Sequence, residues 1–234
     1  MNAIGLTILV LAGLGFGWLV WTLVAKEREQ ARAREQFAME RGWTCTKGGK
    51  HERVFAIQGS EGGMSWTLEA FQGNKNKAGR TVWRTSDPPL TGGVVFVGSK
   101  AMAAILRNPI GNRLARWGLQ VVAGEDDVAK AWNRLMEGYQ EVDTGDPDFS
   151  ALYAILATDP GQASRLLNGD GRRAMLEWEG AHKVGRVTQG RLGLTWSEEG
   201  LSLSWSGSAL KQPDDISAFV AMALRLRPSA RSGW

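Results

Sequence analysis

The side chains that most often carry enzyme or metal chemistry are few in this chain. Cys45 is the single cysteine, and His51 and His182 are the only two histidines. None of the three stands in a CxxC, HxxxH or histidine–carboxylate spacing, so the sequence predicts no zinc site. Cys45 and His51, six residues apart, form an unspecific pair, and no GxSxG nucleophile motif occurs. We interpret Cys45 as a small, half-buried apolar residue beside Trp43 and predict no catalytic residue.

Two further motifs resemble ligand sites at first sight. Residues 93–100, GVVFVGSK, have the glycine spacing of a P-loop, but Ser and Lys are transposed and an apolar run separates the glycines. This pattern predicts a strand that enters a helix. Asp143, Asp146 and Asp148 could suggest calcium, yet the glycine and the terminal glutamate of an EF-hand loop are missing. Pro147 between two aspartates indicates a turn and a helix cap, so we predict neither a metal nor a cofactor.

Three glutamates are candidates for acid–base chemistry. Glu69, Glu177 and Glu179 cannot be paired with one another from the sequence alone. Glu177 and Glu179 flank Trp178 on a predicted short helix, which favours a solvated face. We therefore predict a protein that is not an enzyme, and we rank an enzyme with a dispersed carboxylate site as the last of three hypotheses.

Basic residues gather in two clusters that could contact an anionic partner. The first holds Lys75, Lys77, Arg80 and Arg84, and the second holds Lys100, Arg107, Arg113 and Arg116. Aromatic residues do not interleave with them as in stacking platforms, and the net charge is only +4, so we predict no nucleic-acid partner. The first cluster is a candidate contact with anionic lipid, where each basic residue contributes ~1 kcal/mol. An ordinary solvated face is the alternative.

The chain has an apolar N-terminal segment that precedes all of these groups. Residues 3–25 contain no charge, and a helix of that length reaches ~34 Å, enough to cross a bilayer. A cleaved signal peptide is the alternative, but no basic residue precedes the run and Leu23 stands where a small residue is expected. We predict a single-pass transmembrane helix, with Trp18 and Trp21 at the membrane interface.

The flanks of this helix predict its orientation. No basic residue precedes it, whereas Lys26 and Arg28 follow it directly, and cytoplasmic flanks carry the excess of Lys and Arg. We expect the N-terminus outside and the C-terminal domain in the cytoplasm, at a bacterial inner membrane. Gly13 and Gly17 form a GxxxG face that predicts packing on an integral-membrane partner or self-association. The abundance of glycine in membrane helices is the alternative explanation.

Beyond the span, the pattern predicts a polar helical stalk over 26–41, an α+β domain over 42–228 and a tail over 229–234. The domain could consist of two similar halves, 42–139 and 140–228. Eleven tryptophans predict a substantial hydrophobic core. Short runs rich in β-branched and aromatic residues predict an antiparallel meander, and further segments predict helices. The strands are 54–57, 64–71, 80–85 and 93–97, with one more possible at 119–122; the helices are 100–107, 110–117, 128–136, 162–167, 172–178 and 213–225.

One hairpin is especially clear. Leucines and tryptophans alternate with small or polar residues over 192–196 and again over 201–205, which predicts one buried face and one wet face. Its turn, SEEGLS at 197–202, echoes SEGGMS at 60–65. An internal duplication would explain this echo, and so would the common chemistry of hairpin turns.

Several segments together resemble uncharacterised single-pass bacterial membrane proteins that carry a domain of unknown function. They are ERGW at 40–43, QGSEGGMSW at 58–66, TVWRTS at 81–86, DPDF at 146–149 and GLSLSW at 200–205. The resemblance implies an anchored cytoplasmic α+β domain and transfers no catalytic residue. Our leading hypothesis is an accessory or scaffold subunit of a larger inner-membrane complex, with an energy-transducing complex as one candidate. The alternative is a membrane-tethered sensor of a small ligand or lipid headgroup, bound between the two halves.

Overall fold

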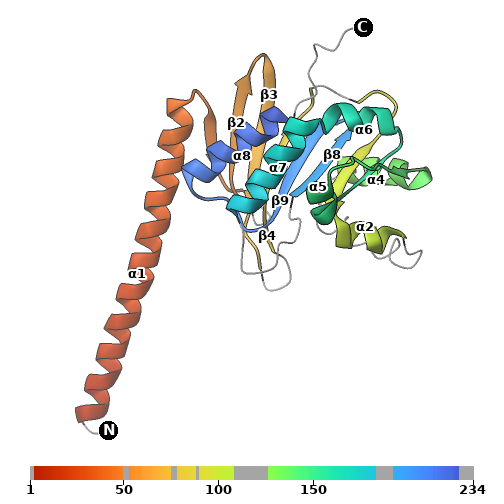
Figure 1. Ribbon diagram of the computed structural model, residues 1–234. Coiled ribbons are helices and arrows are strands. Elements are labelled where there is room, and N and C mark those ends of the chain that lie inside the picture. Colours follow the sequence, from red (N-terminus) through yellow and green to blue (C-terminus); the bar gives the residue numbers. More distant parts are fainter. Residues whose placement is uncertain are drawn as a thin grey trace.

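The computed structural model describes residues 3–49, 53–74, 78–87, 90–107, 126–182 and 192–226, with side chains left out at 3–15, 17, 102, 105–107, 126–130 and 132. A long N-terminal helix leads into an α+β domain built on one large sheet (Figure 1). This confirms the predicted fold class at the level of a large antiparallel sheet with packed helices. The helices are α1 (Ala3–Glu40), α2 (Lys100–Arg107), α4 (Asp126–Glu137), α5 (Pro147–Leu152), α6 (Pro160–Leu166), α7 (Gly169–Ala181) and α8 (Pro213–Arg225).

The sheet has nine strands in the order β1-β2-β3-β4-β9-β8-β5-β7-β6, and every neighbouring pair is antiparallel. The strands are β1 (Thr44–Lys47), β2 (Arg53–Glu61), β3 (Met64–Phe71), β4 (Gly79–Thr85), β5 (Val95–Ser99), β6 (Gln140–Glu141), β7 (Tyr153–Ala157), β8 (Leu192–Ser197) and β9 (Gly200–Gly207).

The predicted meander is right for β2, β3 and β4 and wrong for β5. The hairpin β8–β9 pairs with β4 on one side and with β5 on the other, so it separates two strands that follow each other in sequence. Segments of both predicted halves therefore lie in one continuous sheet. The predicted run 93–100 is confirmed as strand β5 entering helix α2. The predicted segments 110–117 and 119–122 lie outside the described residues.

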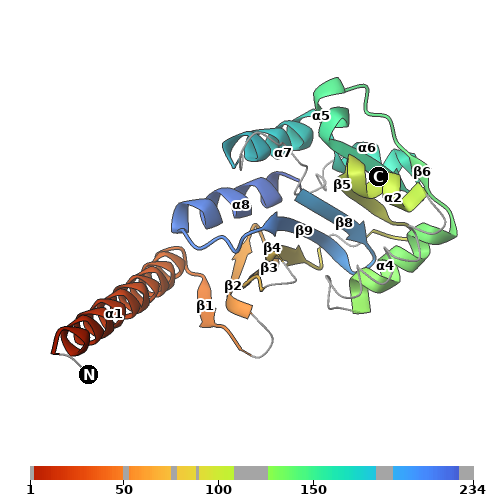
Figure 2. The same ribbon diagram turned by 90° about the horizontal axis from the view of Figure 1, so that it is seen from below.

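One face of the sheet carries the main core. Alternate residues of β8 and β9, such as Leu194, Trp196, Leu203 and Trp205, point to this face and are buried. Helices α5, α6, α7 and α8 cover this face, as Figure 2 shows from below. They contribute residues such as Phe219 to the core. The predicted buried face of the β8–β9 hairpin is thus confirmed. On the opposite face, α4 packs Ala131 and Leu135 onto Phe96 and Leu156 of β5 and β7.

The glutamate pair predicted to be solvated splits between two environments. Glu177 lies on the exposed side of α7, where it pairs with Arg225. Glu179 is buried instead, so that part of the prediction is wrong. Its carboxylate accepts a hydrogen bond of 2.5 Å from the hydroxyl of Tyr153 and one of 3.2 Å from the N–H of Leu192. Burial and the Glu179 carboxylate raise the pKa of Tyr153, which keeps this hydroxyl a donor.

Helix α1 runs without interruption through the predicted span and stalk, and Gly42, with φ of 71°, follows its end. Within the part of the chain that the structure describes, no helix has the length and apolar character that a membrane crossing requires. Most of the predicted span, residues 3–15 and Gly17, is outside the described side chains. The transmembrane prediction for 3–25 is accordingly not confirmed.

The second half of α1 docks against the domain instead of standing free as a polar stalk. Arg34 is buried; it donates a hydrogen bond of 3.3 Å to the carbonyl of Lys211 and lies 4.6 Å from the Phe55 ring centroid. Burial lowers the pKa of its guanidinium, but arginine starts so high that it stays charged. Ala38 is fully buried beside it, and Lys211 also pairs with Glu27. The domain is therefore fixed to α1 over about three turns.

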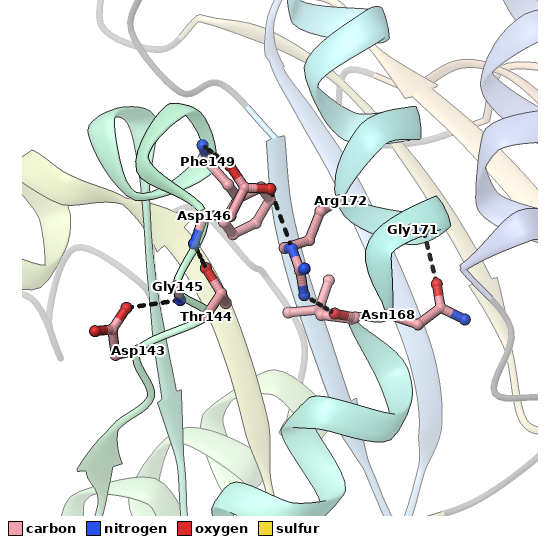
Figure 3. Close-up of polar contacts among 9 residues, drawn as sticks. Asp143, Thr144, Gly145, Asp146, Phe149, Asn168, Gly171 and Arg172 are labelled. Carbon is pink, nitrogen blue, oxygen red and sulfur yellow. Dashed lines mark hydrogen bonds and ion pairs between the residues drawn. The ribbon is translucent and has the colours of Figure 1, made fainter.

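A polar cluster, shown in Figure 3, joins α5 to α7. Asp146 caps α5 by accepting a hydrogen bond of 3.0 Å from the N–H of Phe149, and it pairs with Arg172 of α7 at 3.3 Å. Asp143 accepts from the N–H of Gly145 in the preceding turn. The prediction of a turn and cap at this acidic run is confirmed. Among the described residues, no group of three or more His, Cys, Asp or Glu side chains is placed to hold a metal ion.

We expect Asp146→Ala to lower the midpoint of thermal unfolding by about 3 °C, because an N-cap and an ion pair are lost. The hydrogen bond from Phe149 N–H lowers the pKa of Asp146. The stabilisation by the ionised Asp146 carboxylate is therefore complete above about pH 4, and it is lost as the pH falls through the lowered pKa. The difference in unfolding midpoint between wild type and the variant should accordingly disappear in acid. Thermal unfolding followed by circular dichroism at pH 7 and at pH 2.5 measures the shift of the midpoint and its disappearance in acid. Exposed Asp148→Ala is the control; an equal loss from that variant would contradict the cap assignment.

We expect Arg34→Ala to loosen the docked part of α1, since a buried hydrogen bond and a cation–π contact disappear together. Cleavage at Glu35 by a glutamate-specific protease should become about tenfold faster, because proteolysis of a native segment follows the population of its opened form. The matched control is Arg32→Ala, which changes an exposed arginine of the same helix. Equal cleavage rates for the two variants would show that Arg34 does not hold the helix.

Candidate functional site

A continuous row of polar side chains crosses six strands on the sheet face opposite the main core. Cross-strand pairing aligns Thr44 with Gln58, Gln58 with Thr67, Thr67 with Arg84, Arg84 with Ser202 and Ser202 with Thr195. Directly paired residues share one face, with Cβ atoms about 5 Å apart. These six residues are here called the polar row. Each of them is on the solvent-facing side of a strand whose side chains alternate between the two faces of the sheet. At Thr195 the row meets Phe96, where the apolar contact with α4 begins.

The polar row lies in a groove of about 630 Å³, within the usual range of small-molecule sites. All six residues of the row line it, and Ala131 of α4 stands at one side. Half of the eighteen described lining residues carry a hydroxyl group. The nine hydroxyl-bearing residues are Thr44, Ser60, Ser65, Thr67, Thr85, Ser86, Thr195, Ser197 and Ser202. The lining draws on both predicted halves of the domain.

Two hairpin turns close one end of the groove, and they are the turns whose sequences echo each other. Ser60 and Ser65 flank the β2–β3 turn, and Ser197 and Ser202 flank the β8–β9 turn. Gly200 has φ of 109°, and a Cβ there would lie 2.0 Å from the Thr85 carbonyl oxygen. Only glycine allows this turn to approach β4 so closely. Both turns therefore use glycine at positive φ, and in the β8–β9 turn the close approach to β4 requires it as well.

The charges in the groove are few and balanced. Arg84 and Glu199 are the two charged residues among the described lining residues. Arg84 lies 3.3 Å from Glu69, whose other carboxylate oxygen lies 2.9 Å from Arg53. The Glu199 carboxylate accepts a hydrogen bond of 2.5 Å from the Ser197 hydroxyl. At the rim, Arg134 of α4 pairs with Glu198 of the β8–β9 turn at 2.7 Å. The lining thus presents hydroxyl groups with one guanidinium and one carboxylate held in place.

The first basic cluster is divided by the structure. Arg84 is in the groove, whereas Arg80 lies four residues earlier at the other end of β4, with its guanidinium 4.6 Å from the Phe71 ring centroid. At about 3.3 Å per residue these two arginines are some 13 Å apart along the strand. Lys75 and Lys77 lie outside the described residues. The predicted contact with anionic lipid stays a prediction.

The predicted membrane residues of α1 lie on its exposed surface where the structure describes them. Trp18 and Trp21 are 67% and 68% exposed, and Lys26 and Arg28 are exposed too. Gly13 and Gly17, the predicted helix-packing residues, lie outside the described side chains. The structure therefore leaves their packing role as a prediction.

Cys45 occupies β1 as a half-buried residue packed on the main core, and burial raises the pKa of its thiol. A raised pKa makes the thiol less nucleophilic at neutral pH, in line with a packing role. His51 lies outside the described residues, so the Cys45–His51 pairing is not tested.

The polar row itself was not predicted from the sequence. The wet face of the β8–β9 hairpin was recognised, and the same alternation of hydroxyl-bearing residues in β3 carries a similar signal. What the sequence did not show is that β9 pairs with β4, which joins these faces into one surface.

Comparison with known proteins gives little further information. No family model and no curated protein matches the chain. Among solved structures, the crystal structure of the mycobacterial trehalose monomycolate transport factor A, TtfA, is similar with a TM-score of 0.46 and 12% sequence identity. The match covers 87% of this chain and 96% of that chain. At this TM-score the likeness carries no argument about the function of the present protein.

Proposed function

We propose that the protein is a membrane-anchored accessory protein, without enzymatic activity, whose helix α1 inserts its apolar part into the bilayer and carries the α+β domain. The observation behind this proposal is where exposed hydrophobic side chains occur. Among the described residues, eight large hydrophobic side chains are exposed, and seven of them lie between Phe16 and Val24. They are Phe16, Trp18, Leu19, Val20, Trp21, Leu23 and Val24, here called the apolar segment, with exposed fractions of 41% to 69%.

The side chains of the apolar segment point outward in all directions around the axis of α1. Successive helix positions differ by about 100°, so seven positions within nine residues leave no polar stripe. A partner protein that bound one side would need only a one-sided stripe, whereas lipid contacts a helix around its circumference. Burial of seven such side chains contributes on the order of 10 kcal/mol. The uncharged sequence continues from this segment back to Ala3, which supports insertion.

The docking of α1 gives the anchor a defined relation to the domain. Lys211 pairs with Glu27, two residues beyond the uncharged run, so this edge of the domain sits close to the membrane surface. The end of α1 at Glu40 is about 22 Å further along the helix from Ala25. We propose the cytoplasmic orientation from the Lys and Arg residues that follow the apolar run. A rigid arm of this kind suits a subunit that holds a domain beside a membrane complex.

A second candidate function is a membrane-tethered sensor of a small ligand. The groove favours it, since its volume of about 630 Å³ lies within the usual range of small-molecule sites and its lining is largely polar. In the accessory protein and in the sensor alike, α1 would hold the protein at the membrane, while the α+β domain would make the contact with a partner or a ligand.

We expect deletion of residues 3–25 to move about nine tenths of the protein from the membrane pellet to the soluble fraction, because the apolar segment is removed. The intact chain should stay in the pellet after washing with alkaline carbonate, which strips peripheral proteins. Met39→Asp, at the exposed hydrophobic residue outside the apolar segment, should partition like wild type. Release of the intact chain by carbonate would contradict membrane insertion.

We expect Gly13→Ile to reduce association of the α1 helix with a partner helix or a second copy at least tenfold, because a bulky side chain prevents close approach of the backbones. Gly5→Ile, on the same helix but outside the GxxxG pair, is the control. A membrane two-hybrid assay of self-association, together with quantitative mass spectrometry of proteins co-purified in mild detergent, measures both routes. Unchanged association in both readouts would refute the helix-packing role.

A further inference from the structure

We propose that the groove is a binding site for an uncharged polyhydroxylated compound, a sugar or a polyol, recognised by the polar row. Such a site would give the domain a ligand class of its own, beyond the anchoring function of α1. Three observations support this ligand class: the kind of polar group in the lining of the groove, the balance of charges in that lining, and the position of the groove along α1.

The lining matches a ligand rich in hydroxyl groups. Ser and Thr hydroxyls both donate and accept hydrogen bonds, and Gln58 adds an amide that does the same. A sugar presents groups of the same dual character in an array, so each can be matched without a fixed donor or acceptor pattern. Individual neutral hydrogen bonds contribute about 1 kcal/mol, which makes the number of them decisive. Of the nine described hydroxyl-bearing residues, Thr85 and Ser197 are buried and use their hydroxyls within the protein, and the other seven provide that number.

The charged residues disfavour an ionic ligand. Arg84 and Arg53 share the single carboxylate of Glu69, so these three groups keep one net positive charge, which the Glu199 carboxylate of the same lining offsets. Glu199 places a carboxylate in the lining and would repel a phosphate or a carboxylate group. The positive charge of Arg84 would in the same way repel a cationic ligand. Charged groups do strengthen hydrogen bonds to neutral hydroxyls, so one fixed cation and one fixed anion suit an uncharged ligand.

The position of the groove favours a water-soluble ligand over the headgroup of a surrounding lipid. Gly42 and Thr44, which line the groove, directly follow the end of α1 at Glu40. In Figure 1 the β2–β3 hairpin that closes the groove points away from the N-terminal end of α1. The opposite end of β9 leads to Lys211, which touches α1 at Glu27. If α1 is anchored as proposed, the groove opens about 22 Å from the end of the apolar run.

The test uses the full chain in nanodiscs and a panel of probes observed by saturation-transfer NMR and calorimetry. The neutral probes are maltose, sucrose and myo-inositol, and the anionic probe is glucose 6-phosphate. A further arm places diglucosyl diacylglycerol in the nanodisc itself, which distinguishes a lipid headgroup from a free sugar.

The critical variant is Thr195→Val with Ser202→Ala, which removes two hydroxyls of the polar row while nearly preserving side-chain volume. The matched control is Ser206→Ala, on the same strand and face as Ser202 but outside the groove. We expect at least one neutral probe to bind, with at least tenfold weaker binding by the double variant and unchanged binding by the control. Because both variants change small side chains, far-UV circular dichroism should show the wild-type fold.

Three results would overturn the proposal: no binding of any neutral probe or of the glycolipid, binding of glucose 6-phosphate alone, or neutral binding that the double variant does not weaken. Binding of the glycolipid alone, lost in the double variant, would support the polyhydroxylated class and overturn the water-soluble source. A failure of membrane anchoring would change none of the sugar-binding results, so the two proposals fail separately.

Discussion

The period-two alternation of side chains along β3, β9 and β8 is the constraint on which the rest of the structure depends. In β9, Leu201, Leu203 and Trp205 enter the core while Ser202 and Ser204 face the other way. Because neighbouring strands keep this register, one face of the sheet becomes a continuous apolar surface, and the other is polar from β1 to β8 and apolar where α4 covers β5 and β7. The apolar face takes the helices α5 to α8. The polar face becomes the groove, so folding and the candidate site have the same origin.

The second constraint is the way α1 joins this sheet. Arg34 and Ala38 are buried against the domain, while the apolar segment of the same helix is exposed around its whole circumference. The two halves of one helix therefore have different environments, protein for one and, in our proposal, lipid for the other. Continuity of the helix through both halves fixes the domain relative to the anchor. The groove is then held at the far end of this arm, where hydrated ligands can reach it.

Local patterns predicted the elements well, and they did not predict long-range pairing. Strand β3 and helix α2 have the predicted bounds and helix α8 begins at the predicted Pro213, since hydrophobic period, Pro213 and the flanking glycines are local signals. The insertion of β8–β9 between β4 and β5 is a choice among distant strands with similar alternation, which no local signal decides. The short strands β1 and β6 were missed because they carry little apolar pattern. Burial of Glu179 depends on Tyr153, 26 residues away, and the polar row depends on six strands at once.

The most direct test of the account is a spin-label scan of residues 16 to 24 in proteoliposomes, on a Cys45→Ser background. Each position reports its relative accessibility to oxygen, which dissolves in the bilayer, and to a water-soluble nickel complex. We predict low nickel accessibility at every position, with no periodicity, and high oxygen accessibility at every position that faces lipid. A 3.6-residue periodicity of nickel accessibility would instead show that one side of α1 faces water, and it would contradict insertion of the helix into the membrane.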